Sequence, residues 1–251
     1  MTKIIMHGCN GRMGHVIADI AAADADTKIV AGVDAYGEST YSFPVYKELS
    51  LVKEAADVII DFSNAAAVDG LLDFAASKEI PVVLCSTGLS DAQLEHVRKA
   101  SEKTAVLKSA NMSVGINVLL KVLKEAAPTL AAAGFDMEIV EKHHNQKLDA
   151  PSGTALALAD DINEAAGGDY EYVYDRSSRR EKRPVKEIGI SSVRGGSIVG
   201  DHDVIFAGRD EVITFSHTAY SREIFAKGAV EAAKFLGGKG AGMYDMSNVI
   251  G

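Results

Sequence analysis

The sequence predicts an α/β protein in which a parallel sheet domain flanked by helices is joined to an α+β domain with a mixed or antiparallel sheet. Three observations lead to this fold class. Apolar, β-branched runs alternate with helical segments in the first part of the chain, a glycine cluster follows the first run, and strand-like runs follow one another after residue 187. Alternation is typical of βαβ units, whereas uninterrupted strands are typical of a mixed or antiparallel sheet.

The first part of the chain should build the parallel sheet. Strands are expected at 3–7, 28–34, 56–62, 80–85 and 104–108, and helices at 13–23, 50–55, 65–78 and 90–102. The last of these helices has a clear start signal, because Ser90 can cap it and Gln93 stands at the capping-box position. Continuous apolar strands between helices indicate a sheet that is covered on both faces.

The pattern changes after Asn111, where a second domain should begin. A helix at 115–133 contains Pro128, which should kink or end it. Strands are then expected at 137–142, 187–193, 197–206 and 211–218, with helices at 154–166 and 221–236 and a charged loop at 176–186. We therefore expect residues 1–112 and 222–251 to form one domain and residues 113–221 to form the other.

Composition limits the classes of function. The 251 residues carry 26 Lys and Arg against 35 Asp and Glu, for a net charge of −9. This acidic balance argues against a nucleic-acid partner, which needs a basic surface. Only two cysteines are present, so a disulfide framework is excluded. With no signal-peptide pattern and no apolar run long enough to span a membrane, we expect a cytoplasmic protein without a membrane partner.

The glycine cluster has the position of a dinucleotide-binding turn. Gly8, Gly11 and Gly14 form a G-x-x-G-x-x-G pattern between the first strand and the first helix, and Asp34 follows 20 residues later. Such a turn places a pyrophosphate on the helix N-terminus of a Rossmann-type domain, while the carboxylate accepts hydrogen bonds from the adenosine ribose. The alternative is an ordinary turn with a solvated aspartate.

The expected cofactor is NADH in preference to NADPH. The carboxylate of Asp34 repels a ribose 2′-phosphate, and Ala35 supplies no cation beside it. Arg12 is the one cation in the glycine turn that is able to offset this repulsion.

A second segment concentrates groups able to bind anions and move protons. His143, His144 and Lys147 lie close together after an apolar strand, and Ser152-Gly153-Thr154 open the next helix. Histidine exchanges protons near neutral pH, and a helix N-terminus binds carboxylates. The alternatives are a solvated strand end and a metal site. Adjacent histidines point to opposite faces of a strand, so we expect no metal.

This segment resembles a known family. Residues 143–155, HHNQKLDAPSGTA, resemble the H-H-x-x-K-x-D-A-P-S-G-T-A signature of the 4-hydroxy-tetrahydrodipicolinate reductase (dihydrodipicolinate reductase) family. The similarity extends in order through residues 8–14, 61–63, 86–88, 110–117, 194–202 and 221–229. Cys85 departs from the family pattern, which commonly has glycine there. The resemblance implies NAD(P)H-dependent reduction of a small dicarboxylate, 4-hydroxy-tetrahydrodipicolinate, to tetrahydrodipicolinate in diaminopimelate and lysine biosynthesis.

The resemblance also implies residue roles. His143 is the expected general acid/base and Lys147 a second proton donor, while the expected substrate ligands are His144, Ser152, Gly153 and Thr154. The expected cofactor-binding residues are Gly8, Cys9, Asn10, Gly11, Arg12, Met13, Asp34, Cys85, Ser86, Thr87, Ser109, Ala110, Asn111 and Met112. The first domain is then the dinucleotide-binding domain, and the second binds substrate and forms a homotetramer. The alternatives are another Rossmann-type oxidoreductase and a non-enzymatic NAD(H)-binding redox sensor.

Overall fold

The computed structural model describes residues 1–36 and 41–251. These residues form two compact units, 1–114 with 223–251 and 115–222. The boundaries expected from the sequence differ from these by at most two residues. The roles assigned to the two domains stay a prediction at this point.

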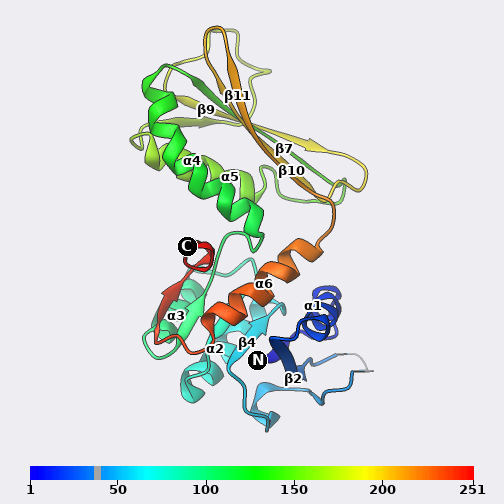
Figure 1. The fold of residues 1–251 in the computed structure, drawn as a ribbon. Coiled ribbons are helices and arrows are strands. Elements are labelled where there is room, and N and C mark those ends of the chain that lie inside the picture. The colour runs from blue at the N-terminus through cyan, green and yellow to red at the C-terminus, as the bar shows by residue number, and fades with distance from the viewer. Residues whose placement is uncertain (37–40) are drawn as a thin grey trace. The chain divides into compact units, whose positions relative to one another are not determined.

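The first unit contains a parallel sheet of seven strands (Figure 1). The strands are β1 (Thr2–His7), β2 (Thr27–Val33), β3 (Val45–Tyr46), β4 (Val58–Asp61), β5 (Val82–Leu84), β6 (Ala105–Leu107) and β12 (Gly242–Tyr244). Their spatial order is β12-β6-β5-β4-β1-β2-β3, and every neighbouring pair is parallel. The predicted Rossmann-type sheet is therefore confirmed. The order reverses at β1, which places the turn after β1 at the usual ligand-binding position of such sheets.

Helices cover the two faces of this sheet. They are α1 (Arg12–Ala23), α2 (Ala65–Lys78), α3 (Asp91–Ser101), α6 (Glu223–Leu236), α7 (Met246–Ile250) and the short 3₁₀ helix η1 (Leu49–Leu51). The predicted capping box is present at the start of α3, where the Ser90 hydroxyl accepts from the Gln93 amide and the Gln93 side chain accepts in return. This exchange satisfies amides that have no partner inside the helix.

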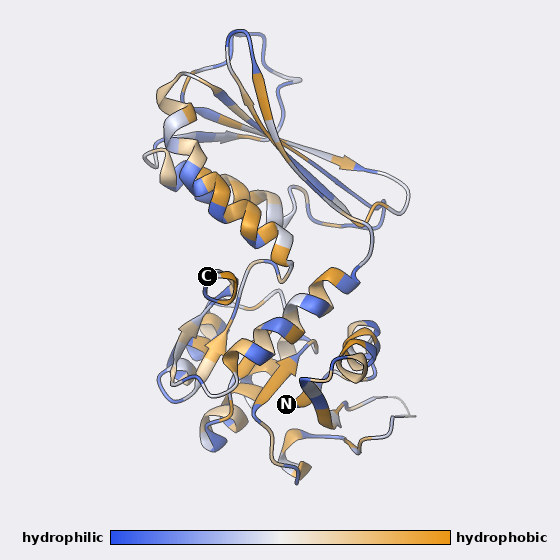
Figure 2. Cartoon of the chain, viewed as in Figure 1, coloured by the Kyte–Doolittle hydropathy of each residue, from blue (hydrophilic) through white to orange (hydrophobic). Residues whose placement is uncertain are grey.

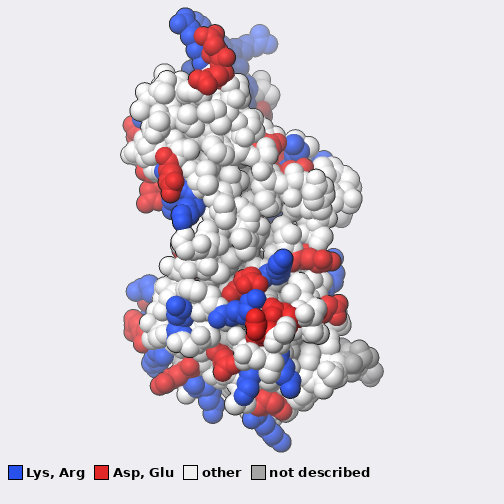
Figure 3. All heavy atoms as spheres, in the orientation of Figure 1, with Lys and Arg blue, Asp and Glu red and all other residues white. Residues whose placement is uncertain are grey.

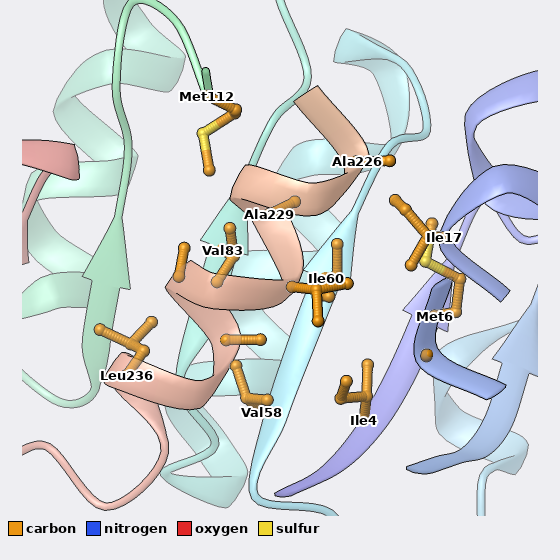
Figure 4. Close-up of a cluster of buried hydrophobic side chains, with 14 of the residues drawn as sticks. Ile4, Met6, Ile17, Val58, Ile60, Val83, Met112, Ala226, Ala229 and Leu236 are labelled. Carbon is orange, nitrogen blue, oxygen red and sulfur yellow. The ribbon is translucent and has the colours of Figure 1, made fainter. Parts of the chain in front are cut away.

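The helix α6 completes the core of the first unit. Ala226, Ala229 and Leu236 of α6 are buried against apolar side chains of the central strands, among them Ile4 and Ile60 (Figure 4). The central strands β4 and β5 are fully buried and almost wholly hydrophobic, as expected for a sheet covered on both sides (Figure 2). Burial of one such aliphatic side chain contributes about 1.5–3 kcal/mol. This packing explains why the chain returns to its first domain after residue 222.

Three short elements of this unit were missed by the sequence analysis: β3, β12 and α7. The β12 strand is only three residues long and follows a glycine-rich stretch, so no local pattern marks it. It exists because its backbone pairs with Ala105, Val106 and Leu107 of β6. The pairing is a tertiary interaction that periodicity does not encode.

The second unit contains a five-stranded mixed sheet. Its helices are α4 (Val114–Ala132) and α5 (Gly153–Ala165), and its strands are β7 (Asp136–His143), β8 (Glu171–Val173), β9 (Glu187–Arg194), β10 (Gly200–Ala207) and β11 (Val212–Ala219). The order is β11-β10-β7-β9-β8. Strand β10 is antiparallel to β7 and β11, whereas β9 is parallel to β7 and β8. The predicted α+β domain with a mixed sheet is confirmed.

The helix α4 differs from expectation at Pro128. The helix does not end there but continues to Ala132. Buried Leu123 and Ala127 lie on the apolar side of α4 and pack in the core of this unit, while Pro128 is exposed. Packing of the apolar face therefore outweighs the hydrogen bond that proline cannot donate.

None of the helices within the described ranges has the length and apolar character that crossing a membrane requires.

Candidate active site

The glycine turn after β1 is shaped by close backbone contacts. Gly8 has φ +82°, and a Cβ placed there would lie 2.6 Å from the carbonyl oxygen of Phe62. A Cβ on Gly14 would lie 2.3 Å from the carbonyl oxygen of Cys9. Only glycine fits both positions, so the turn and the first turn of α1 pack directly against each other. No side chain of the described residues caps the start of α1, and its first turn contains no acidic residue.

Asp34 joins this turn to the end of β2. Its Oδ2 accepts from the backbone amide of Asn10 at 2.9 Å, and its Oδ1 accepts from that of Tyr36 at 3.0 Å. The Asn10 amide side chain donates to the Tyr36 carbonyl oxygen at 2.7 Å. Each carboxylate oxygen keeps a second lone pair for a ligand hydroxyl.

A pocket of about 710 Å³ opens beside this turn. The lining combines residues of the glycine turn and a carboxylate with apolar side chains. It includes Gly8, Asn10, Gly11 and Asp34 on the one hand and Phe62, Ala67, Leu71 and Phe74 on the other. The volume is typical of a small-molecule site. An uncapped helix start for phosphates, a carboxylate for ribose and an apolar wall for a planar base fit an adenine dinucleotide.

The other expected cofactor residues take different positions in the first unit. Cys9 and Met112 are buried in the hydrophobic core, so only their backbone atoms are available to a ligand. Burial raises the pKa of the Cys9 thiol to about 11. Arg12 is exposed at the first position of α1, followed by half-buried Met13. The remaining residues follow the carboxyl ends of neighbouring strands, with Cys85, Ser86 and Thr87 after β5 and Ser109, Ala110 and Asn111 after β6.

In the second unit, His143 lies at the end of β7 with its ring held on both sides. Its Nδ1 is 2.5 Å from Glu141 Oε2, and its ring packs edge-on against His202 at 5.2 Å between centroids. A Cβ added to Gly200 would lie 3.1 Å from His143 Nε2, so glycine leaves room for the imidazole. Burial lowers the pKa of His143, and the hydrogen bond and charge of Glu141 oppose this only in part.

Glu141 is the centre of this arrangement. It is fully buried, and Arg194 donates to both of its oxygens, at 2.8 Å to Oε2 and 2.7 Å to Oε1. The backbone amide of Ser152 donates to Oε1 at 3.2 Å. Burial acts to raise the pKa of Glu141, but hydrogen bonds from Arg194, Ser192 and His143 outweigh it and hold the pKa at about 2. Glu141 is therefore a carboxylate that fixes the orientation of His143.

Ser152 is the N-cap of α5. Its hydroxyl accepts from the Ala155 amide at 3.1 Å and forms a second hydrogen bond with His202 Nε2, also at 3.1 Å. Burial, followed by the charge of His143, lowers the pKa of His202 to about 4, so this ring is neutral at pH 7. Gly153 and Thr154 form the first turn of α5. The helix start, at the positive end of the helix dipole, is suited to a carboxylate.

The cationic groups of the segment lie nearer the surface. Lys147 Nζ is 2.8 Å from Asp149 Oδ1, so the two form an ion pair. His144 is half-buried, and Arg222 donates to its Nε2 at 3.3 Å. No group of three or more metal-binding side chains occurs among residues 1–36 and 41–251.

Sequence reasoning assigned no role to Glu141, Arg194 and His202. A partial signal was available for Glu141, because positions 141 and 143 lie on the same face of a strand. Arg194 reaches the site through pairing of β9 with β7, which sets His143 opposite Arg194. His202 reaches it through the antiparallel pairing of β10, which sets His202 opposite Glu141.

Two family models together match nearly the whole chain. The dihydrodipicolinate reductase N-terminal model matches residues 2–112, and the dihydrodipicolinate reductase C-terminal model matches residues 115–250. The chain belongs to the dihydrodipicolinate reductase family. The predicted family is thereby confirmed, and the chain is an oxidoreductase.

Individual dihydrodipicolinate reductases agree with this result. The chain is 54% identical to the 4-hydroxy-tetrahydrodipicolinate reductase of Caldanaerobacter subterraneus subsp. tengcongensis, over 100% of this chain and 98% of that protein. It is 48% identical to the enzyme of the same name from Clostridium tetani, over 98% and 96%. A dipicolinate-bound dihydrodipicolinate reductase from Paenisporosarcina sp. TG-14 has the same fold, with a TM-score of 0.77, 24% identity and coverage of 100% and 99%.

Proposed function

We propose that this chain reduces 4-hydroxy-tetrahydrodipicolinate to tetrahydrodipicolinate, with loss of water, using NADH or NADPH. This reaction belongs to diaminopimelate and lysine biosynthesis. The proposal is supported by relatives of this name that match the full chain, one of them at 54% identity. The structural observation that carries it is the buried His143–Glu141–Arg194 arrangement beside the N-terminus of α5.

The substrate is a small dicarboxylate, and the groups around α5 are suited to bind it. The backbone amides of Gly153 and Thr154 lie at the positive end of the helix dipole, where an anion is stabilised by roughly 0.3–1 kcal/mol or more. Lys147 adds positive charge and His144 a hydrogen-bonding ring in the segment that leads into α5. Ser152 keeps the helix start in shape through its cap to Ala155 and its bond to His202.

His143 is proposed to hold and move the proton of the reaction. With Nδ1–H donated to Glu141, the neutral ring presents Nε2 as its free proton site. A dianionic substrate nearby favours the protonated form, from which Nε2 donates a proton as negative charge develops on the ring nitrogen. Lys147 is the second donor. When bound, a reduced nicotinamide supplies the hydride. Acid catalysis of this kind contributes about 10²–10⁴-fold to the rate.

The test is a coupled assay with freshly made product of a dihydrodipicolinate synthase as substrate. Wild type should oxidise the cofactor, and His143→Gln and Lys147→Met should lose about 10²-fold or more in kcat, with the Kd for NADH unchanged. Lys182→Met, an exposed lysine of the charged loop, is the matched control and should keep full activity. No cofactor oxidation by the wild-type enzyme would refute the function, and full kcat in both variants would refute the roles.

NADH is the proposed preferred cofactor. The Asp34 carboxylate lines the pocket at the end of β2, where a ribose 2′-hydroxyl is a better ligand than a 2′-phosphate. The ratio of kcat/KM for NADH and NADPH measures this preference. A clear advantage for NADPH would contradict it.

We also propose a cytoplasmic homotetramer assembled through the second unit. The eight-residue strand β11 is an edge strand, and its alternate residues Val212, Thr214, Ser216 and Thr218 are exposed. Such an edge and face are suited to pairing with further copies. Sedimentation equilibrium should give four times the mass of the chain, and a monomer would refute the proposal. Cys9 and Cys85 are both free thiols, in keeping with a reducing compartment.

No partner of the nucleic-acid or membrane class is proposed. On the face shown in Figure 3, Lys and Arg side chains are interspersed with Asp and Glu over the first unit. A mixed surface of this kind favours solubility rather than polyanion binding.

A further inference from the structure

Lys47 stands beside Asp34 at the carboxyl edge of the first sheet. Strands β2 and β3 are parallel, with Gly32 opposite Val45 and Val33 opposite Tyr46. The backbone amide of Asp34 donates to the Tyr46 carbonyl oxygen at 2.9 Å, which continues the same ladder. Lys47 is therefore the register neighbour of Asp34, although the two are 13 residues apart in sequence.

The side chain of Lys47 is directed to the backbone that follows Asp34. Its Nζ donates to the carbonyl oxygen of Ala35 at 3.3 Å. Lys47 is exposed, and within the described ranges it makes no ion pair with a carboxylate. Its ammonium group thus keeps two further donors for a ligand.

Lys47 and Asp34 also line the same pocket. Ala35 and Tyr36 also belong to the lining, and Glu48 is a second acidic residue there. Among the described lining residues, Lys47 is the one Lys or Arg. Arg12, the cation that the sequence analysis singled out, is not among them.

We propose that Lys47 is the residue that binds the 2′-phosphate when this pocket takes NADPH. The inference rests on the proposed cofactor site and adds a specificity determinant to it. A lysine ammonium group binds phosphate as a compact point charge. Its position next to Asp34 offsets the repulsion between that carboxylate and a 2′-phosphate, so both cofactors bind and the preference for NADH is modest.

Calorimetric titration with NADH and with NADPH, in the absence of substrate, tests this directly. Lys47→Met keeps most of the side-chain volume and removes the charge. We expect its Kd for NADPH to rise about tenfold, equivalent to about 1.4 kcal/mol, and its Kd for NADH to change less than twofold. The NADPH effect should shrink at high salt, because the site is exposed. Lys53→Met, an exposed lysine outside the pocket, is the matched control and should leave both Kd values unchanged.

Two results would overturn the role of Lys47 and leave the cofactor site standing. The first is an equal change in the Kd for NADH and NADPH in Lys47→Met. The second is a selective loss of NADPH binding in Arg12→Met with none in Lys47→Met. Failure of wild type to bind either cofactor would instead refute the cofactor site itself. Neither titration depends on turnover. An enzyme that binds both cofactors but does not reduce the substrate would therefore refute the proposed reaction and leave the proposed role of Lys47 to be decided by the titrations.

Discussion

Replacement of Glu141 by Gln is the sharpest test of the proposed proton site. The carboxylate accepts hydrogen bonds on both oxygens, from His143 and from both terminal nitrogens of Arg194. A glutamine amide accepts on one atom only. In either orientation of Glu141→Gln, the NH₂ group therefore faces a terminal nitrogen of Arg194, donor against donor. When it takes the place of Oε2 it also faces His143, where it forces the other imidazole tautomer.

The magnitude follows from the pKa of Glu141 and from its burial. The drop from 4.5 to about 2 is worth roughly 3 kcal/mol of unfolding free energy at neutral pH. This contribution is present above pH 4.5 and is lost as the pH falls toward 2, because the unfolded carboxyl protonates first. Glu141→Gln lacks it at every pH and leaves Arg194 without its carboxylate, so a loss of roughly 3–5 kcal/mol is expected.

Activity should fall with a characteristic change in pH dependence. We expect kcat to decrease by about 10²–10⁴-fold. The charge of Glu141 raises the pKa of His143 against the effect of burial. Its removal should therefore move the limb of the pH profile that belongs to His143 to lower pH. Glu141→Asp keeps the charge. It should retain part of the activity and show a smaller shift of the pH profile than Glu141→Gln.

The assays are urea unfolding at pH 7 and pH 4, the pH profile of kcat, and the Kd for NADH. The NADH titration reports on the first unit, and an unchanged Kd shows that this unit is folded in the variant. Glu125→Gln, an exposed residue of α4, is the matched control. A Glu141→Gln enzyme with wild-type kcat and an unshifted profile would refute the reasoning.

Two further predictions concern the glycine turn and the second buried histidine. Gly14→Ala places a Cβ 2.3 Å from the Cys9 carbonyl oxygen. We therefore expect a loss of about 1–3 kcal/mol in unfolding free energy and at least tenfold weaker NADH binding. An unchanged free energy in urea unfolding and an unchanged Kd in the NADH titration would contradict this. Because burial lowers the pKa of His202 from 6.5 to about 4, the unfolded state takes up a proton first as the pH falls. From pH 7 to pH 5, wild type should therefore lose roughly 2 kcal/mol more stability than His202→Asn, and equal losses in urea unfolding would argue against it.

The sequence alone determined the parts of the protein that depend on local chemistry. A β-branched run, the glycines at positions 8, 11 and 14, and the helix that follows them mark the strand–turn–helix of the proposed cofactor site. The capping box at Ser90 and Gln93 marks a helix start. The segment from His143 to Thr154 contains both the proposed proton-transfer groups and the start of α5. This part of the candidate site could therefore be predicted from the sequence.

Tertiary structure decided which distant residues complete these sites. Arg194 and His202 reach Glu141 and His143 because β9 and β10 flank β7 in a fixed register. Lys47 comes to lie beside Asp34 because the two-residue strand β3 pairs with β2. A shift of one residue in any of these ladders would turn those side chains to the opposite face. The register is set by hydrophobic burial and by backbone pairing across the whole sheet. The local sequence around Glu141, Arg194 or Lys47 therefore does not predict which residues become neighbours.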